Sequence, residues 1–354
     1  MQIRLKLTQK IMLTTSLVLA LAIGAIAIIS TAQSSRYLEE AARTDLEHLT
    51  KSAADVCRVN AEQAQKKVAS DLATARRLFD QAGGNKVEVK LGQIVLTGNG
   101  ENYPVNDDTK FVDEITRLTG SACTIFQKEG DKARRVATSV TKADGTRAVG
   151  TYISDEVYDA VFRNGRTFYG RAWVVNRWMV TAYEPIRDVS GGIVGCFFVG
   201  VDERSALLRD VILGQKIGET GYIYAMDGTG VLQIHPKIEG ESIAQHDFAK
   251  EMLANAPKLA PGEVGWVKYE WDRNGVMAEK IVAYAYLKEW NWIIGAGSYI
   301  DEFTAPSTNI RNSIAWIGLT MLAIAIILSY LMARSIVLPV KKLVNVAEAV
   351  AIGD

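Results

Sequence analysis

Two uncharged, apolar stretches constrain this chain more than any other feature of its sequence. Residues 11–32 read IMLTTSLVLALAIGAIAIISTA, and residues 314–332 read IAWIGLTMLAIAIILSYLM. As an α-helix, each stretch is long enough to cross the hydrocarbon core of a bilayer, which is about 30 Å thick. A cleaved signal peptide is the alternative for the first stretch, but its apolar run is longer than usual and STAQSS is a weak cleavage site. We therefore predict transmembrane helices at 11–32 and 312–333.

Basic residues flank the outer ends of both stretches. They are Arg4, Lys6 and Lys10 on the N-terminal side, and Arg334, Lys341 and Lys342 on the C-terminal side. Because positive charge collects at the cytoplasmic ends of membrane helices, we expect both ends of the chain, including a tail at residues 1–10, in the cytoplasm. The roughly 280 residues in between then lie outside. They contain no third apolar run of similar length, which argues against a multi-span transporter.

The composition argues against two classes of protein. Lys and Arg number 40 together, as do Asp and Glu, so the formal net charge is zero, whereas nucleic-acid binders usually carry a basic excess. The three cysteines, Cys57, Cys123 and Cys196, are too few and too scattered for a disulfide scaffold, and no CxxC pair indicates zinc or redox chemistry. We expect no nucleic-acid partner and no cofactor.

The segment at residues 33–82 has the composition of one long helix. It contains no proline or glycine between Ser34 and Gln81, and its apolar residues recur at helical spacing. Such a helix is about 60 Å long or more at 1.5 Å per residue, and Gly83 and Gly84 are expected to end it. Its alanine-rich face suits packing against the same helix of a second copy, which predicts a homodimer.

Beyond this helix the sequence nearly repeats itself. LTGSACTIFQKEG at residues 118–130 is echoed by ETGYIYAMDGTG at 219–230, about a hundred residues later, and a second pair of similar segments has the same offset. Two tandem modules of one type, at 83–201 and 218–304, are the economical interpretation, with a short connecting helix at 202–217. Strand-like runs around a helical section predict a small antiparallel sheet in each module, which is the α+β class.

These modules resemble a known sensory family. GYIYAMDGTGVLQIHPKIEGESI, followed by GWVKYEWDRNG and KIVAYAYLKEWNWIIGAGSYIDEF, is similar to the second type of Cache module. GSACTIFQKEGDKARRVATSV, followed by FYGRAWVVNRWMVTAYEPIRDVSGGIVGCFFVGVD, is similar to the third type. Over roughly residues 91–303, the pair resembles the fused double Cache region of bacterial chemoreceptors and sensor kinases. The resemblance implies a PAS-like sheet in each module.

The segment at residues 334–354 resembles the first helix of a HAMP linker. Pro339 follows the second apolar stretch closely, and Glu348 and Gly353–Asp354 complete the pattern. An unrelated basic amphipathic helix behind a membrane anchor is the alternative. Since a HAMP unit needs a second helix, the resemblance implies the front part of a longer receptor. It also implies that Pro339 and Glu348 are signalling residues.

The resemblance implies a methyl-accepting chemotaxis receptor in the bacterial inner membrane, with its sensory region in the periplasm or outside the cell. It would sense a small molecule, namely a small organic acid or another anion. It would signal as a homodimer to a cytoplasmic adaptor and kinase through a region beyond residue 354. A sensor histidine kinase or diguanylate cyclase with the same sensory region is the alternative. A membrane-anchored extracellular binding protein or enzyme is a lesser alternative.

Catalysis and metal binding are not expected at His235. No GxSxG elbow occurs and no cysteine lies near this histidine in the sequence, although nucleophilic catalysis needs a nucleophile beside its base. His235, His246 and Asp247 match no familiar zinc spacing, and the DGTG turn at residues 227–230 lacks the alternating oxygens of a calcium loop. We therefore predict no catalytic residue, no metal site and no enzymatic activity.

A binding pocket fits the aromatic residues of the second module better. Alternation along a strand groups Tyr222 with Tyr224, and Gln233 with His235. Aromatic walls with one cation and a few donors suit a small carboxylate, and the resemblance to Cache modules points the same way. The predicted ligand-binding residues are Tyr222, Tyr224, His235, Trp266, Lys280, Tyr284 and Tyr286. The alternative is a set of half-buried tyrosines in a module without a ligand of its own.

The first module offers a second set of candidates. The resemblance implies that arginine, lysine and small hydroxyl groups bind carboxylates here, and RRVATSV at residues 134–140 has this chemistry. The predicted ligand-binding residues are Arg134, Thr138, Ser139, Arg147, Arg171 and Tyr183. Exposed arginines are commonly only solvated and this module has no histidine, so the choice between the modules stays open. Cys123 and Cys196 lie in matching core strands, where buried free thiols are favoured over a disulfide.

Overall fold

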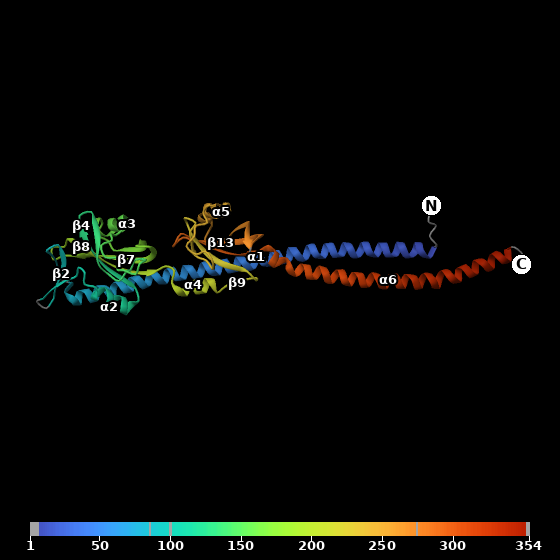
Figure 1. Cartoon of the computed structure of the whole chain (residues 1–354), viewed down its shortest axis with the longest axis horizontal. Helices are drawn as coiled ribbons and strands as arrows, with labels where there is room; N and C mark the ends of the chain where they lie inside the picture. The colour runs from blue at the N-terminus through green and yellow to red at the C-terminus, as the bar shows by residue number, and fades with distance from the viewer. Residues whose placement is uncertain (1–6, 85, 99–100, 274, 352–354) are drawn as a thin grey trace.

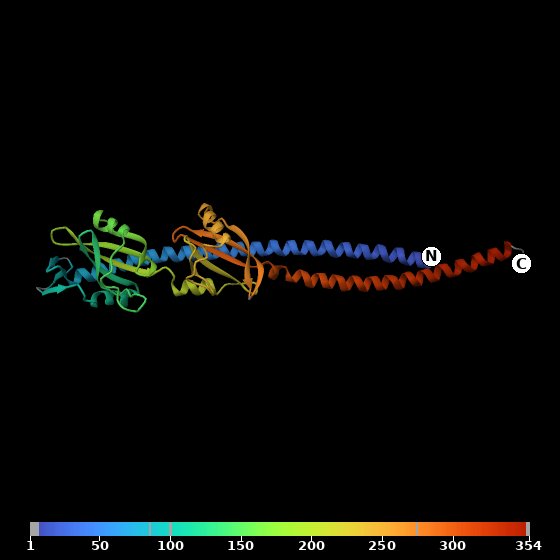
Figure 2. The same cartoon turned by 45° about the horizontal axis from the view of Figure 1, so that its top comes forward.

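The molecule is elongated, with two long helices at one end and two sheet modules at the other (Figures 1 and 2). The structure is a computed structural model that describes residues 7–84, 86–98, 101–273 and 275–351. Helix α1 (Leu7–Phe79) packs along α6 (Ile300–Ala351) and then continues as the axis that carries both modules. We call residues 87–202, which lie farther from α6, the distal module, and residues 216–299 the proximal module.

Helix α1 is unbroken because its sequence contains no glycine or proline after Gly24. It ends in a π-helical turn, Asp80–Gly84, in which Gly83 has a φ of 103°. This left-handed conformation favours glycine because no Cβ is present. One face of α1 is buried against both sheets. The buried residues on this face include Leu46, Ala53, Cys57, Ala61, Val68, Leu72, Ala75 and Phe79.

The distal module is built on a five-stranded antiparallel sheet with the order β5-β4-β8-β7-β6. Its strands are β4 (Ala122–Glu129), β5 (Lys132–Thr138), β6 (Phe168–Val174), β7 (Arg177–Arg187) and β8 (Ile193–Asp202). A small second sheet and a helix lie at the tip: β1 (Val87–Lys90), β2 (Gln93–Gly98), β3 (Glu101–Pro104) and α2 (Lys110–Thr119). Helix α3 (Asp155–Tyr158) and the π-helical turn Asp159–Arg163 contact the main sheet.

The proximal module repeats this topology with the order β11-β10-β14-β13-β12, and β9 adds to β10. Its strands are β9 (Lys216–Ile217), β10 (Gly221–Asp227), β11 (Leu232–Ile234), β12 (Gly265–Arg273), β13 (Val276–Leu287) and β14 (Trp292–Tyr299). Helix α4 (Ala206–Leu213) precedes the sheet. Helix α5 (Asp247–Asn255) and the 3₁₀ turn Ala256–Lys258 pack on its strands.

Each sheet has two differently covered faces. Side chains alternate between the faces along every strand, and one face of both sheets packs on α1 in a single apolar core. The opposite faces form two separate cores, one in the distal module and one in the proximal module. The predicted α+β class, with a long N-terminal helix and two antiparallel-sheet modules, is confirmed.

Strand β14 ends at Tyr299, and α6 begins at the next residue without a loop. Two helical stretches are long and apolar enough to cross a membrane, one at the start of α1 and one at Asn312–Leu331 in α6. A Cβ on Gly318 would lie 2.5 Å from Cγ2 of Ile23, so the two helices touch there. Pro339 and Glu348 both lie within α6, whereas Gly353–Asp354 lies outside the described residues.

Candidate ligand-binding sites

Three predicted residues of the proximal module meet on the face of the sheet that points away from α1. Tyr222 comes from β10, His235 directly follows β11, and Lys280 comes from β13. The Nε2 atom of His235 lies 3.2 Å from the hydroxyl oxygen of Tyr222. The Nζ atom of Lys280 lies 3.7 Å from the centre of the Tyr222 ring. We call these three residues the proximal cluster.

Lys280 is a buried cation without a counter-ion. Its side chain is only 1% exposed, and within the described part of the chain no carboxylate lies within ion-pair distance of Nζ. Burial lowers the pKa of Lys280 to about 7, with a further lowering by Lys237 and an opposing effect of Glu302. The electron-rich face of Tyr222 therefore stabilises the ammonium group in place of a carboxylate.

The hydrogen bonds of His235 fix its tautomer. Its Nδ1 atom accepts the backbone N–H groups of Lys237, at 3.1 Å, and Ile238, at 3.0 Å. Burial and the nearby Lys280 lower the pKa of His235 to about 4, so the ring is neutral at pH 7. A neutral ring that accepts at Nδ1 carries its proton on Nε2. His235 thus donates to the hydroxyl oxygen of Tyr222, and the hydroxyl proton of Tyr222 is left to donate to another group.

The cavity beside this cluster is very small. Its volume is about 10 Å³, which is room for about one water molecule. The lining residues are Tyr222, Tyr224, Leu232, His235, Ile238, Ile243, Phe248, Tyr269 and Trp271. Phe248 on α5 stacks on Tyr269 of β12 with their ring centres 3.7 Å apart. A larger molecule can therefore enter only if side chains of this lining move.

The remaining predicted residues of this module have different positions. Tyr224 and Tyr284 are buried in the same apolar core as the cluster, and Tyr286 packs at its edge, where it donates to Oδ1 of Asn291 at 2.8 Å. Trp266 packs on the α1 side of the sheet, with the guanidinium of Arg43 at 5.1 Å from its ring. Trp266 therefore lies on the face opposite to the proximal cluster.

The predicted pairing of Gln233 with His235 is also wrong. A register shift between Ala225 and Met226 leaves Gln233 as an extra residue in β11. Such a bulge changes the phase of the alternation. Leu232 and His235 consequently share the cavity, whereas the side chain of Gln233 donates to Oδ2 of Asp227 at 2.7 Å.

Three aromatic walls of the cavity were not among the predicted residues, namely Phe248, Tyr269 and Trp271. Tyr269 and Trp271 stand two apart in the segment VKYEWDR, so alternation along β12 was a usable signal for both. Phe248 comes from α5, and no pattern within its own segment indicates that it would meet Tyr269.

The arginines predicted in the distal module bind groups of the protein itself. Arg134 donates to Glu129 at 2.7 Å, and Arg147 donates to Asp113 at 2.7 Å and to the carbonyl of Thr138 at 2.6 Å. The other predicted polar residues are also engaged. Arg171 forms a two-pronged pair with Glu203 at 2.6 and 2.8 Å, Thr138 contacts the hydroxyl of Thr124 at 2.6 Å, and Ser139 contacts that of Thr116 at 2.7 Å.

The neighbouring Arg135, a candidate in the RRVATSV segment that is not in the predicted set, is the buried cation of this module. Its side chain is 3% exposed, and it lies 5.0 Å from the centre of the Phe126 ring. Tyr183, which was predicted, is buried on the same face. Because Arg134 and Arg135 are consecutive in a strand, they point to opposite sides. That alternation was the available signal.

Comparisons with known proteins agree with this architecture. The profile of the Cache 3/Cache 2 fusion domain matches residues 31–313, which is more than half of the chain. The chain belongs to this family. The methyl-accepting chemotaxis protein McpC of Bacillus subtilis is 28% identical over 181 residues, which are 51% of this chain and 25% of McpC. McpP of Pseudomonas putida is 28% identical over 129 residues, which are 34% of this chain and 23% of McpP.

The chain thus spans about a quarter of the length of these two relatives. Among solved structures, the ligand-binding domain of the Campylobacter jejuni chemoreceptor Tlp3, in complex with L-valine, is 12% identical. The match covers 76% of this chain and 97% of the Tlp3 domain, with a TM-score of 0.41.

The cysteines of the Cache modules are free and buried. Strands β4 and β8 are neighbours, but Cys123 pairs with Val199 and Cys196 pairs with Phe126. Cys123 packs on the α1 side and Cys196 on the opposite face, so the two thiols do not meet. Over the described residues, no group of three His, Cys, Asp or Glu side chains is placed to hold a metal ion.

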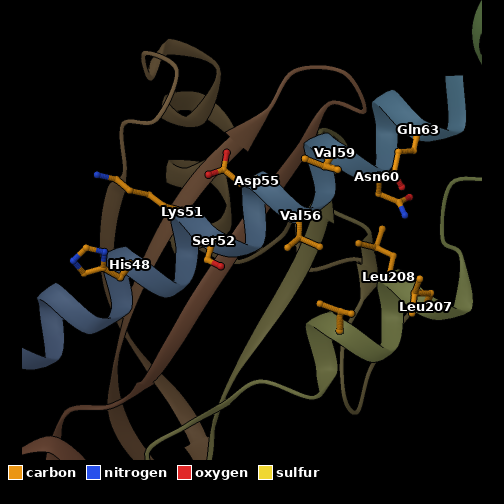
Figure 3. A pocket seen from close by; sticks show the side chains of 11 residues that line it. His48, Lys51, Ser52, Asp55, Val56, Val59, Asn60, Gln63, Leu207 and Leu208 are labelled. Carbon is orange, nitrogen blue, oxygen red and sulfur yellow. The ribbon is translucent and has the colours of Figure 1, made fainter. Parts of the chain in front are cut away.

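A larger groove lies outside the Cache sheets, between α1 and α4 (Figure 3). Its volume is about 600 Å³. Figure 3 shows Val56, Val59, Leu207 and Leu208 among its lining residues, and Leu207 is 72% exposed. The cation beside it, Lys51, is bonded to Glu47 at 2.6 Å. A long groove between two helices, lined by polar and apolar side chains, suits another helix better than a small anion.

Proposed function

We propose that the chain is the extracytoplasmic sensory region of a chemotaxis receptor and that its proximal cluster binds a small organic anion. The family match and the two chemoreceptor relatives support the assignment as a receptor. In this proposal the chain senses and transmits, and it catalyses no reaction.

Buried Lys280 is the observation that carries the ligand class. Among the described residues it has no carboxylate partner, and the adjacent Tyr222 has a hydroxyl proton to donate. A carboxylate would accept from both groups and would supply the missing negative charge. The aromatic side chains around the cavity would enclose the apolar remainder of such a ligand. A small organic acid satisfies both requirements.

The cluster lies close to the start of α6, which gives a route for the signal. Lys280 pairs with Tyr299, the last residue of β14. Glu302 in the first turn of α6 accepts from the backbone N–H of Glu219 at 3.0 Å and from the side chain of Ser298 at 2.7 Å. It also bonds the hydroxyl of Thr220, two residues before Tyr222. Movement of β10 on ligand binding would therefore pull directly on α6.

The cavity must open to admit a ligand, so binding favours an arrangement in which Phe248 and Tyr269 are apart. A ligand shifts the balance between two arrangements only by its difference in affinity for them, and such coupling is typically about 1–3 kcal/mol. We expect a small displacement of α6 that continues past Pro339 and Glu348 as the input to a HAMP-like linker.

The proposed setting is the bacterial inner membrane. The apolar stretches of α1 and α6 would cross it, with both Cache modules in the periplasm or outside the cell. The groove between α1 and α4 would take the same helices of a second copy in a homodimer. An adaptor and kinase would bind a cytoplasmic region beyond residue 354. A sensor histidine kinase or diguanylate cyclase is the second candidate, and the sequence beyond residue 354 distinguishes them.

Binding measurements on the full chain in lipid nanodiscs test the ligand class. We expect isothermal titration to detect at least one of acetate, pyruvate and succinate, and not methylamine. Lys280→Met should weaken that binding at least tenfold. Lys288→Met is the matched control because Lys288 is exposed in the same module, and it should leave the affinity unchanged. Binding of methylamine in place of carboxylates, or equal affinities in the two variants, would show that the proposal is wrong.

A further inference from the structure

A cavity that the proposed function does not use lies at the tip of the distal module. It is formed where the end of α1 meets α2 and the strands β2 and β3, and α2 lies beside the end of α1 in Figure 1. Its volume is about 490 Å³, which is within the range of small-molecule sites, roughly 300–1,000 Å³. We call it the tip cavity.

The floor of the tip cavity is apolar and deeply buried. Phe79 of α1, Leu96 of β2 and Ile125 of β4 are each at most 1% exposed, and so is Val105, which follows β3. These four side chains belong to the apolar core on the α1 side of the distal sheet. The tip cavity therefore lies against the core that joins the sheet to α1, and not against the opposite face, where Tyr183 is buried.

Aromatic side chains form much of the wall of the tip cavity. Phe79 and Phe111 line it with their ring centres 5.7 Å apart and an interplanar angle of 69°. Tyr103 is a third aromatic wall. Edge-to-face and offset contacts with ring centres about 4.5–7 Å apart are the favoured arrangements of aromatic pairs. These walls can therefore make contacts of the same kind with a further ring placed in the cavity.

The polar groups of the lining have partners within the protein or lie at the mouth. The hydroxyl of Tyr103 donates to Oδ2 of Asp108, and burial raises the pKa of Tyr103 to about 12, so the hydroxyl keeps its proton. Glu114 accepts two bonds from Arg117, at 2.7 and 2.8 Å, and Lys110 is exposed at the mouth. Among the described residues, no buried side-chain polar atom of this lining lacks a partner. The interior therefore offers a ligand neither a charge nor an unused hydrogen bond.

The shape of the lining favours a small molecule over a second protein chain. In the groove between α1 and α4 the apolar side chains project, with Val59 45% and Leu207 72% exposed. In the tip cavity the apolar side chains are recessed, and even Leu78 and Phe111 at its edge are partly buried. A partner chain binds projecting side chains, whereas a recessed apolar hollow with polar groups at its mouth is the usual form of a small-molecule site.

We propose that the tip cavity binds a small uncharged molecule with an aromatic ring. The ring lies on the apolar floor between Phe79 and Phe111, and a polar substituent stays at the mouth in contact with water. Phe79 also packs edge-on against Phe197 of β8, with ring centres 4.4 Å apart, so the ligand touches a side chain that joins α1 to the sheet. The site shares no residue with the proximal cluster, which belongs to another sheet and another core. Its failure would leave the proposed function unaffected.

Titration with benzamide tests the proposal on the full chain in lipid nanodiscs, with the signal of empty nanodiscs subtracted. We expect benzamide to bind. Because it carries no charge, Lys280→Met should leave its affinity unchanged. Acetamide, which lacks the ring, should not bind. Cyclohexanecarboxamide, the saturated counterpart of benzamide, should bind at least about twofold more weakly, since it loses the aromatic contacts.

Two variants locate the benzamide site. Ala82 lines the tip cavity and is exposed, so Ala82→Phe places a ring at the mouth and should weaken benzamide binding at least tenfold. Ala73→Phe is the matched control, because Ala73 is exposed on α1 and does not line the cavity, and it should leave the affinity unchanged. Phe111→Leu removes one aromatic wall but keeps an apolar side chain. It should weaken the binding severalfold, and it replaces Ala82→Phe should that variant not fold.

Four results would overturn the proposal. The first is absence of benzamide binding, and the second is binding that Ala82→Phe and Phe111→Leu both leave intact. Loss of binding in Lys280→Met would place benzamide at the proximal cluster instead. Equal or tighter binding of cyclohexanecarboxamide would exclude aromatic recognition. If benzamide failed to bind and Ala82→Phe, but not Ala73→Phe, dissociated a dimer in sedimentation measurements, a second copy of the chain would be the occupant of the cavity.

Discussion

The two Cache modules share one sheet topology but place their cations at different corners of it. Matching the modules through their strand pairings sets Met179 against Lys280 and Leu232 against Arg135. The partners of Lys280 are absent from the distal module as well. Ala122 stands at the position of Tyr222, and Thr138 stands at the position of His235. The two modules thus share their backbone topology but carry the buried positive charge at different positions. For this reason, the site in one module does not predict the site in the other.

The cores of the two modules also place an aromatic ring on different strands. Phe198 on β8 is fully buried in the distal module, and Gly295 on β14 takes the matching position in the proximal module. The space is filled from the neighbouring strand, because a Cβ on Gly295 would lie 2.6 Å from the Tyr224 ring. Thr124 occupies the position of Tyr224 in the distal module. In each module one aromatic ring therefore fills this part of the core, and the ring comes from a different strand in each.

The largest effect is expected when this ring is removed from the distal module. Phe198→Ala should lower the free energy of unfolding by about 3–5 kcal/mol, since it opens a cavity beside Tyr183, whose ring centre is 5.0 Å away. Chemical denaturation of the full chain measures the loss, and hydrogen exchange of β4–β8 locates it. Supplying the ring from the other strand, with Thr124→Tyr and Phe198→Gly together, should recover stability relative to Phe198→Gly alone. If the double variant were no more stable, the rings would not be equivalent.

The sequence was sufficient for everything that depends on long periodic patterns. The absence of glycine and proline predicted α1, and the repeat at about a hundred residues predicted two sheets that have the same strand order. Alternation within β10 also grouped Tyr222 with Tyr224, and both pack in the apolar core of one sheet face. These inferences held because regular strands and helices fix side-chain directions over several residues.

The errors concentrate where the backbone departs from regular alternation. Bulges in the β4/β5 and β10/β11 pairs shift the phase by one residue, and such a shift moves every later side chain to the other face. Gln233 was grouped wrongly for this reason. Arg134 and Arg135 are identical residues next to each other, so only the face of the strand distinguishes their side chains. Arg134, the predicted ligand-binding residue, points to the surface. No local pattern marks a bulge, so these positions required the structure.

The second-largest expected effect is a pH dependence of stability. Lys280 causes it, whereas its distal counterpart, Met179, has no ionisable group. The folded-state pKa of Lys280 lies near 7, below its value near 10.5 in an unfolded chain. Below pH 7 the side chain is protonated in both states and adds no pH dependence. Above pH 7 the folded state releases the proton and the unfolded state keeps it, so stability rises with pH, by an amount on the order of 3 kcal/mol between about pH 7 and pH 9.5.

Denaturation curves between pH 7 and pH 9.5 check this expectation. Lys280→Met, which gives the proximal module the residue type of the distal one, should remove the rise, and exposed Lys288→Met should keep it. A carboxylate bound at Lys280 would raise the pKa of the ammonium group, so a saturating ligand should flatten the curve of the unsubstituted chain. An equal pH slope in the chain and in Lys280→Met would contradict the buried, unpaired state of this lysine.

The smallest effect is expected at the surface arginines of the distal module. Arg147 is bonded to Asp113, and both side chains are about 40% exposed. Exposed ion pairs contribute about 0–1 kcal/mol, so Arg147→Met should change the free energy of unfolding by less than 1 kcal/mol. It should also leave carboxylate binding at the proximal cluster unchanged. Loss of carboxylate binding in Arg147→Met, with unchanged affinity in Lys280→Met, would reverse the assignment, because the charge that matters would then lie at the surface of the distal module and not inside the proximal sheet.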